Sequence, residues 1–171
     1  MGYLEILADT HLAWQLPAFE GRLRVKERRH PKLYWVDPGV MRAAKGELHP
    51  PGEAERGPLL EGWVATLLRA YGDPETGLGS RYDGVFYWAP AEGAREVDFL
   101  LRRRKKLVAV EVKAKRTLAS RDFAGLRAVA ELPGMERRLV VFLGDRPFRT
   151  EDRIDALPVP AFIEAVEQGH I

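Results

Sequence analysis

Three charged residues on two short hydrophobic segments are the part of this sequence best suited to chemistry. Asp98 lies within Val97–Leu101. Glu111 and Lys113 stand at the end of Leu107–Lys113. Both segments have the length and apolar content of β-strands, and a hairpin between them would bring the three side chains together. Two carboxylates and an ammonium group at a strand end can bind Mg²⁺ and place a water molecule against a phosphodiester.

The alternation of side chains along the second strand supports this grouping. Successive side chains of a strand point to opposite faces of its sheet, so Glu111 and Lys113 share a face. Three valines of the same segment fill the opposite face, which predicts a buried strand. Buried charge without a partner is costly. We therefore expect Glu111 and Lys113 to meet each other, Asp98 or a metal ion.

Four residues are the candidate catalytic set. Asp98 and Glu111 would ligate Mg²⁺ or Mn²⁺ directly, with the backbone carbonyl of Val112 as a candidate third ligand. Glu61 lies beside the apolar stripe of a predicted helix and could reach the same ion or a water bound to it. Lys113 would orient the attacking water or stabilise the pentavalent phosphorane. The metal would make that water acidic enough to act as a nucleophile near neutral pH.

Each of these residues also has an interpretation without chemistry. Glu111 and Lys113 could belong to a solvated strand face. Asp98 could pair with Arg95 or Arg102. Glu61 could be an exposed carboxylate in the first turn of a helix, where the helix dipole favours it. The order of these residues along the predicted elements is what favours a functional site.

Five consecutive cations form the predicted tip of the hairpin. They are Arg102, Arg103, Arg104, Lys105 and Lys106. Such a run is most often a solvated turn. If it binds DNA, we expect contacts to the phosphate backbone rather than to base edges. Three strand aromatics could stack on bases, although strand aromatics more often belong to a core: Tyr82, Tyr87 and Trp88.

Composition narrows the class of protein. A chain of 171 residues with 46% hydrophobic residues predicts one domain with a small appendage. The absence of cysteine excludes disulfides, thiolate catalysis and zinc–thiolate sites, and fits a reducing cytoplasm. No apolar run is long enough for a bilayer and no signal peptide pattern is present, so we expect a cytoplasmic protein without a membrane partner. The net charge of +2 makes local clusters of cations more informative than the total.

The N-terminal third predicts short elements. Residues 2–16 predict a helix followed by a strand, and residues 32–36 predict a second strand. Asp37 could cap a short helix that has Pro38 at its first position. Residues 46–57 have the composition of a linker. We place an N-terminal extension at 1–53 and a core domain at 54–171.

The core domain predicts an α/β (α+β) fold. Its elements are a helix with apolar residues from Leu60 to Tyr71, strands at 82–89, 95–101 and 106–113, a helix from Ser120 to Pro133, a buried strand at 139–143, a further strand at 154–159 and a helix at 160–168. Three closely linked strands imply an antiparallel meander. The helix that follows implies a right-handed parallel crossover. The result is a mixed central sheet flanked by helices.

This order of elements and residues resembles the PD-(D/E)XK phosphodiesterase superfamily, which has the restriction-endonuclease-like fold. The superfamily core is helix, three strands, helix, strand, with an Asp on the second strand and Glu/Asp-Xaa-Lys on the third. Asp98, Glu111 and Lys113 match that motif, and Glu61 matches a Glu frequent on the first helix. Val97 stands where many members have Pro. The resemblance implies hydrolysis of DNA with Mg²⁺ or Mn²⁺, of endonuclease or junction-cleaving type.

A closer similarity covers nearly the whole chain. Four segments look like the uncharacterised C-terminal domain of a family of prokaryotic AAA-type ATPases: Lys32-Leu-Tyr-Trp-Val-Asp-Pro-Gly, Leu60-Glu-Gly-Trp-Val, Glu96-Val-Asp-Phe-Leu and Val110-Glu-Val-Lys. In that family an ATPase module and a winged helix precede the nuclease-like domain, and residues 1–30 look like the winged-helix tail. The ATPase module is missing from this sequence.

The missing module leaves three interpretations open: a stand-alone relative, a split gene or a decayed remnant. A separate ATPase is therefore a candidate partner. The missing module also keeps open an alternative function, a non-catalytic DNA-binding or regulatory module acting with that ATPase. An enzyme that cuts a duplex would favour a homodimer, because one site attacks one strand.

Overall fold

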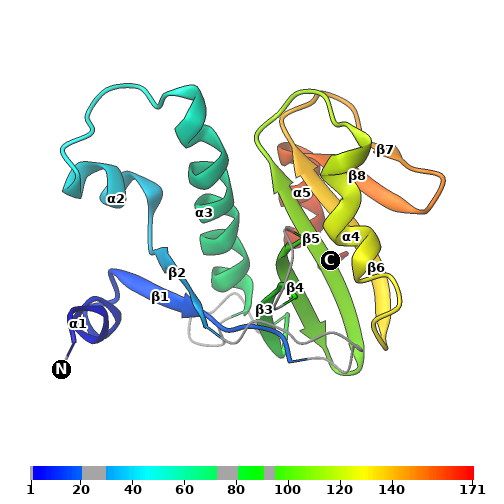
Figure 1. Cartoon of the computed structure of the whole chain (residues 1–171), viewed down its shortest axis with the longest axis horizontal. Helices are drawn as coiled ribbons and strands as arrows, with labels where there is room; N and C mark the ends of the chain where they lie inside the picture. Colours follow the sequence, from blue (N-terminus) through cyan, green and yellow to red (C-terminus); the bar gives the residue numbers. More distant parts are fainter. Residues whose placement is uncertain (1, 21–29, 73–80, 91–94) are drawn as a thin grey trace.

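A six-stranded mixed sheet forms the centre of the molecule, with helices on both faces (Figure 1). The computed structural model describes residues 2–20, 30–72, 81–90 and 95–171. The strand order is β3-β4-β5-β6-β8-β7. These strands are β3 (Gly84–Trp88), β4 (Val97–Arg103), β5 (Lys106–Lys113), β6 (Met135–Phe142), β7 (Phe148–Arg149) and β8 (Ile154–Pro158).

The remaining elements are helices and a separate strand pair. The helices are α1 (Tyr3–Asp9), α2 (Pro38–Ala44), α3 (Glu53–Gly72), the 3₁₀ helix η2 (Ser120–Phe123), α4 (Ala124–Ala128) and α5 (Val159–Glu167). Strands β1 (Ala13–Leu16) and β2 (Lys32–Trp35) form an antiparallel pair. None of the helices in the described residues has both the length and the apolar composition to cross a bilayer.

The connections of the central sheet agree with the sequence. β3, β4 and β5 form the predicted antiparallel meander. η2 and α4 then lead to β6, which lies parallel to β5, so the predicted crossover is confirmed as a parallel connection. β8 adds a further parallel strand next to β6, and α5 closes the described chain as the apolar pattern of residues 160–168 predicts.

Each face of the sheet carries its own hydrophobic core. On one face, α3 and α5 bury Leu68 and Phe162 against Phe99 and Val110. The opposite face packs against η2 and α4, and its buried side chains include Leu126. Because side chains alternate between these faces along β5, the two cores leave polar residues only at the strand ends.

The N-terminal elements contact both α3 and the edge of the sheet. The Asp37 side chain caps α2 by accepting a hydrogen bond from the Val40 backbone at 3.0 Å, as the sequence predicts. Ala18 forms a parallel bridge with Tyr87 on β3. The Phe19 amide donates to the Tyr87 carbonyl at 2.7 Å in the same segment. This short pairing joins the N-terminal segment to the outer strand of the sheet.

Several predicted boundaries were wrong. The predicted linker at 46–57 is helical from Glu53. Acidic residues in the first turn of α3 favour the start of a helix. They offset the backbone hydrogen bond that is lost at Pro58 inside α3. The predicted helix from Ser120 to Pro133 is a 3₁₀ turn followed by the short α4. β4 continues to Arg103, so the hairpin tip is only Arg104 and Lys105 rather than the whole basic run.

Gly125 allows α4 to lie against the start of β4, and its replacement tests this close packing. A Cβ atom at Gly125 would collide with the backbone oxygen of Glu96. We expect Gly125→Ala to lower the free energy of unfolding by about 1–3 kcal/mol, because neither backbone can move freely. Chemical denaturation measures this change.

The matched control is Gly62→Ala within α3, where a Cβ atom would make an ordinary contact at 3.6 Å from Pro38. That substitution should raise the free energy of unfolding by about 0.5–1 kcal/mol, because alanine favours a helix interior. Equal effects from the two substitutions would contradict the close packing of α4 on β4.

Candidate functional site

Asp98 lies where the regular pairing of β4 ends. Phe99 pairs with Val110, so Asp98 and Glu111 come next on the two strands. On the other side, β4 carries one more residue than β3 between its last two pairs, which is a β-bulge at Asp98 and Phe99. A bulge redirects side chains near a strand end. Here the Oδ2 atom of Asp98 accepts a hydrogen bond from the Val112 backbone at 2.8 Å.

Glu111 and Lys113 meet each other, as the alternation of side chains predicts. The Lys113 ammonium donates to Glu111 Oε1 at 2.5 Å. The second oxygen, Oε2, is buried and has no hydrogen-bond partner among the described residues. Asp98 and Glu111 are each only 7% exposed. The site therefore contains two buried carboxylates, one of which has a free oxygen.

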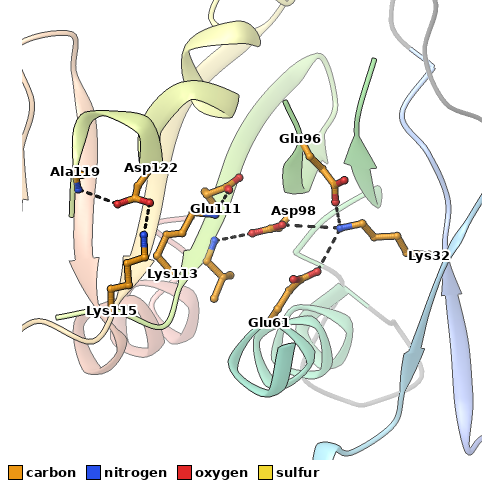
Figure 2. Close-up of polar contacts among 10 residues, drawn as sticks. Lys32, Glu61, Glu96, Asp98, Glu111, Lys113, Lys115, Ala119 and Asp122 are labelled. Atoms are coloured by element: carbon orange, nitrogen blue, oxygen red, sulfur yellow. Dashed lines mark hydrogen bonds and ion pairs between the residues drawn. The ribbon is translucent and has the colours of Figure 1, made fainter. Parts of the chain in front are cut away.

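Lys32 connects Asp98 to two further carboxylates, as Figure 2 shows. Its ammonium group lies 3.3 Å from Glu61 and 3.9 Å from Asp98, and it also forms an ion pair with Glu96. Glu61 comes from α3 and also accepts a hydrogen bond from the Tyr34 hydroxyl at 2.5 Å. Glu61 is thus linked to Asp98 through their shared ion-pair partner, Lys32. The sequence predicted instead that Glu61 could reach the metal ion or a water bound to it.

A second ion pair continues the row of charges on the other side of Lys113 (Figure 2). Lys115 donates to Asp122 at 2.7 Å, and the Ala119 backbone donates to the same carboxylate at 2.8 Å. Burial alone would raise the pKa of Asp122, but these two hydrogen bonds lower it below its usual value. Asp122 is therefore ionised and holds Lys115 beside the end of β5.

Burial and mutual repulsion dominate the electrostatics of the two central acids. Burial raises the pKa of Asp98, the charges of Glu111 and Glu61 raise it further, and Lys32 opposes them. Burial also raises the pKa of Glu111, against the opposing charge of Lys113. Both carboxylates are thus costly to ionise in the folded protein.

The two lysines remain protonated in this environment. Burial would lower the pKa of Lys32, but the charges of its carboxylate partners, Glu61 above all, raise it. The same balance holds for Lys113, where Glu111 outweighs burial and raises the pKa. Protonated lysines can hold anions in place but cannot accept a proton.

We use the name acidic site for the four carboxylates and two lysines just described: Glu61, Glu96, Asp98, Glu111, Lys32 and Lys113. With every group ionised, the acidic site has an excess of two negative charges. In the described part of the chain, no three His, Asp or Glu side chains are grouped so as to hold a metal ion. Mg²⁺ is commonly held by one or two carboxylates plus water, and Asp98 with the free oxygen of Glu111 fits that requirement.

Sequence reasoning missed three members of the surrounding network. Lys32 and Glu96 carry the ion pairs that link α3 to β4, and Tyr34 fixes Glu61. Lys32 and Tyr34 stand two positions apart on a predicted strand, so a shared face could be inferred. The sequence held no signal for the element that this face would meet.

The alternative interpretations of individual residues have separate outcomes. Asp98 pairs with Lys32 in place of the predicted Arg95 or Arg102, and the Arg102 guanidinium lies 4.9 Å from the Phe86 ring centre. The three strand aromatics that could have stacked on bases belong to the core: Tyr82, Tyr87 and Trp88 are each 3% exposed.

The basic run lies at the far end of the hairpin from the acidic site. Arg103 pairs with Lys106 across β4 and β5 at that end, and Arg104 and Lys105 form the exposed turn. Lys106 also forms a 2.5 Å ion pair with Glu136. Contact between this run and DNA stays a prediction.

A comparison with protein families covers most of the folded core. The model of a domain of unknown function, DUF4143, matches residues 56–162, from α3 into α5. The chain belongs to the DUF4143 family. Within this DUF4143 match lie the four predicted catalytic residues, whereas Lys32 and Tyr34 lie outside it. No curated protein and no solved structure matches the chain. The DUF4143 description names no activity, so the relationship to PD-(D/E)XK enzymes stays a prediction.

The raised pKa of Asp98 predicts how stability depends on pH in a metal-free buffer. A carboxyl group with a raised folded-state pKa binds more protons when folded, so stability falls as pH rises above the ordinary Asp pKa. We expect Asp98→Asn to be more stable than the wild type at pH 8, because Asn keeps the acceptor for Val112 and removes the charge. Denaturation curves across pH measure the difference. Each tenfold difference in proton affinity between the folded and unfolded protein corresponds to about 1.4 kcal/mol.

The advantage of Asp98→Asn should vanish as pH falls to the ordinary carboxyl range, where Asp98 is protonated in both states. A matched control is Asp145→Asn, because Asp145 is exposed and pairs with Arg116. A loss of stability for Asp98→Asn at pH 8 would instead show that Lys32 and Val112 outweigh burial.

Proposed function

We propose that this DUF4143 domain is a metal-dependent phosphodiesterase that hydrolyses DNA, built on a restriction-endonuclease-like core. The observation that carries the proposal is the meeting of two buried carboxylates with a protonated lysine at one strand end. The Lys113 ammonium lies 2.5 Å from Glu111, and Asp98 bonds to the backbone between them. Raised pKa values at both acids and a charge excess of two negatives favour a divalent cation.

The order of elements supports the same proposal. α3, the β3–β5 meander, α4 and β6 follow the order expected of a restriction-endonuclease-like core. Asp98 stands on the second strand of that order, and Glu111 and Lys113 stand on the third. These residues therefore match the motif both in residue type and in the strands on which they stand.

Asp98 and Glu111 are the residues that would hold Mg²⁺ or Mn²⁺. Glu61 is hydrogen-bonded to Tyr34 and ion-paired with Lys32, so it fits a role in positioning Lys32 beside Asp98. A bound divalent cation would supply an acidic water molecule and neutralise charge on the phosphate.

Lys113 would act on the phosphodiester during hydrolysis. In that reaction a water oxygen bonds to phosphorus while the bond from phosphorus to the leaving oxygen breaks, and one proton of the water is transferred through solvent to the leaving oxygen. Negative charge grows on the phosphoryl oxygens, and a fixed ammonium group stabilises it. The raised pKa keeps Lys113 protonated, so it favours electrostatic stabilisation over accepting the proton of the water.

Cleavage of DNA is the direct test. Purified protein should nick supercoiled plasmid with Mg²⁺ or Mn²⁺ and not with chelator present. Asp98→Asn should abolish nicking, and Lys113→Met should slow it by about 10²–10³-fold, the loss seen when one charge-stabilising group is removed. The control Arg116→Met removes an exposed cation near the end of the same strand and should leave nicking unchanged.

Nicking that survives both substitutions would assign the activity to a contaminant. Salt-sensitive DNA binding without nicking, in a protein that binds the cation, would favour the alternative of a non-catalytic module that acts with a separate ATPase.

Binding of the cation can be measured without activity. Mn²⁺ should raise the thermal unfolding midpoint of the wild type, since a ligand that binds only the folded state stabilises it. The effect should disappear in Asp98→Asn. Lys32→Met should respond to Mn²⁺ more strongly than the wild type, because it leaves three carboxylates with less neutralising charge. Equal responses of the wild type and Asp98→Asn would contradict this metal site.

A further inference from the structure

A basic pocket of about 790 Å³ lies at the end of the sheet where β4 turns into β5. Its cationic lining residues come from the hairpin, from β6 and from the β7–β8 segment: Arg103, Arg104, Lys106, Arg137, Arg138, Arg149 and Arg153. Two acids line it as well, Glu136 and Asp155. Counting side chains alone, five positive charges remain in excess. We call this cavity the basic pocket.

The two acids of the basic pocket form ion pairs with only some of its cationic side chains. Asp155 is buried and accepts hydrogen bonds from Arg137 at 2.8 Å and from Arg149 at 2.5 Å. Burial alone would raise the pKa of Asp155, but Arg149 and Arg137 lower it, so the carboxylate is ionised. Asp155 thus fixes two guanidinium groups at the pocket wall before any ligand arrives.

Three arginines of the basic pocket have no carboxylate partner among the described residues. They are Arg103, Arg104 and Arg153. A fourth, Arg138, donates to backbone carbonyls of Leu126 and Asp152. Guanidinium groups that converge without counter-charges form a site for an external anion, because their planar donors match phosphate oxygens.

The backbone gives an independent reason to assign a role to two of these side chains. Arg104 has φ of 58° and Arg153 has φ of 61°, in the left-handed region that glycine and asparagine adopt more easily. Among the described residues, only His11 shares this feature outside glycine. Arg104 and Arg153 lie on different turns that both border the basic pocket. The chain thus keeps arginine at two positions where its backbone is unfavourable.

The basic pocket is separate from the acidic site. Asp98 and Arg104 lie at opposite ends of β4, whose course can be followed in Figure 1. Six residues of extended strand at about 3.3 Å each separate them by about 20 Å. A phosphate in the basic pocket is therefore not the phosphate that Lys113 would contact.

We propose that the basic pocket binds a compact polyphosphate, a diphosphate or triphosphate group carried by a free nucleotide or by the 5′ end of a nucleic-acid strand. Its volume falls in the range of small-molecule pockets, whereas contact with a continuous duplex backbone needs an extended surface. Its charge excess matches a group with several negative charges. The proposal does not depend on hydrolysis at the acidic site.

The test measures binding of inorganic triphosphate by isothermal titration calorimetry at low salt with chelator. The wild type should bind, with affinity that falls as salt rises. The double variant Arg104→Gly, Arg153→Gly should lose about a hundredfold in affinity, roughly tenfold for each charge-assisted contact. Its unfolding midpoint should be unchanged or raised, because glycine relieves both left-handed residues.

Two controls separate the basic pocket from general effects. His11→Gly relieves the same backbone strain elsewhere and should leave triphosphate binding unchanged. Asp98→Asn should also bind as the wild type does, because the acidic site is remote. Absence of binding to the wild type at low salt, unchanged affinity in the double variant, or loss of binding in Asp98→Asn would each overturn the proposal.

The source of the polyphosphate is distinguished with three further probes. Affinity for ATP equal to that for inorganic triphosphate points to a free nucleotide. Tighter binding of an oligonucleotide with a 5′-triphosphate points to a strand end. The third probe is an oligonucleotide with a 5′-hydroxyl. If it binds as tightly as the triphosphate, and if the double variant weakens both equally, the pocket binds the phosphates of a continuous nucleic-acid backbone. The proposal then fails.

Discussion

One hydrogen bond, from the Val112 backbone to the Asp98 carboxylate, holds the acidic site together. Where β4 leaves its regular pairing, this side chain takes the place of a backbone carbonyl and accepts the bond at 2.8 Å. Val112 lies between Glu111 and Lys113, so the same contact sets the position of Asp98 relative to both. Lys32 then approaches Asp98 from the N-terminal strand pair. A change in the register of the hairpin would separate all of these charges at once.

The sequence predicted the parts of the site that depend on local periodicity. Strand alternation placed Glu111 and Lys113 on one face, and they form the ion pair that a buried strand end requires. The apolar spacing from Leu60 to Tyr71 predicted α3, and the continuous apolar run at 139–143 predicted the buried part of β6. The alternation and spacing of apolar residues indicate which side chains are buried, and this information is contained in short segments of sequence.

The parts that depend on contacts between distant segments could not be predicted. Lys32 reaches Glu61, Glu96 and Asp98 from β2. This strand is not part of the central sheet, and α2 separates it from α3 along the chain. The basic pocket gathers arginines from the β4–β5 hairpin, from β6 and from the β7–β8 segment, and only the hairpin run was visible in the sequence as a cluster. The start of α3 was missed for a different reason. The Gly- and Pro-rich composition of residues 46–57 predicted a linker, yet the acidic first turn and the packing of α3 outweigh the hydrogen bond lost at Pro58.

The short pairing of Ala18 with Tyr87 has a consequence for self-association. An outer strand with free amides and carbonyls can recruit a strand from another molecule. At β3 the Pro17 and Phe19 backbones already bond to Tyr87, and at the opposite margin β7 has only two residues, Phe148 and Arg149. Both margins of the sheet are thus poor templates for extending it across two copies. Extension of the sheet across its margins is therefore an unfavourable way for two copies of this protein to associate.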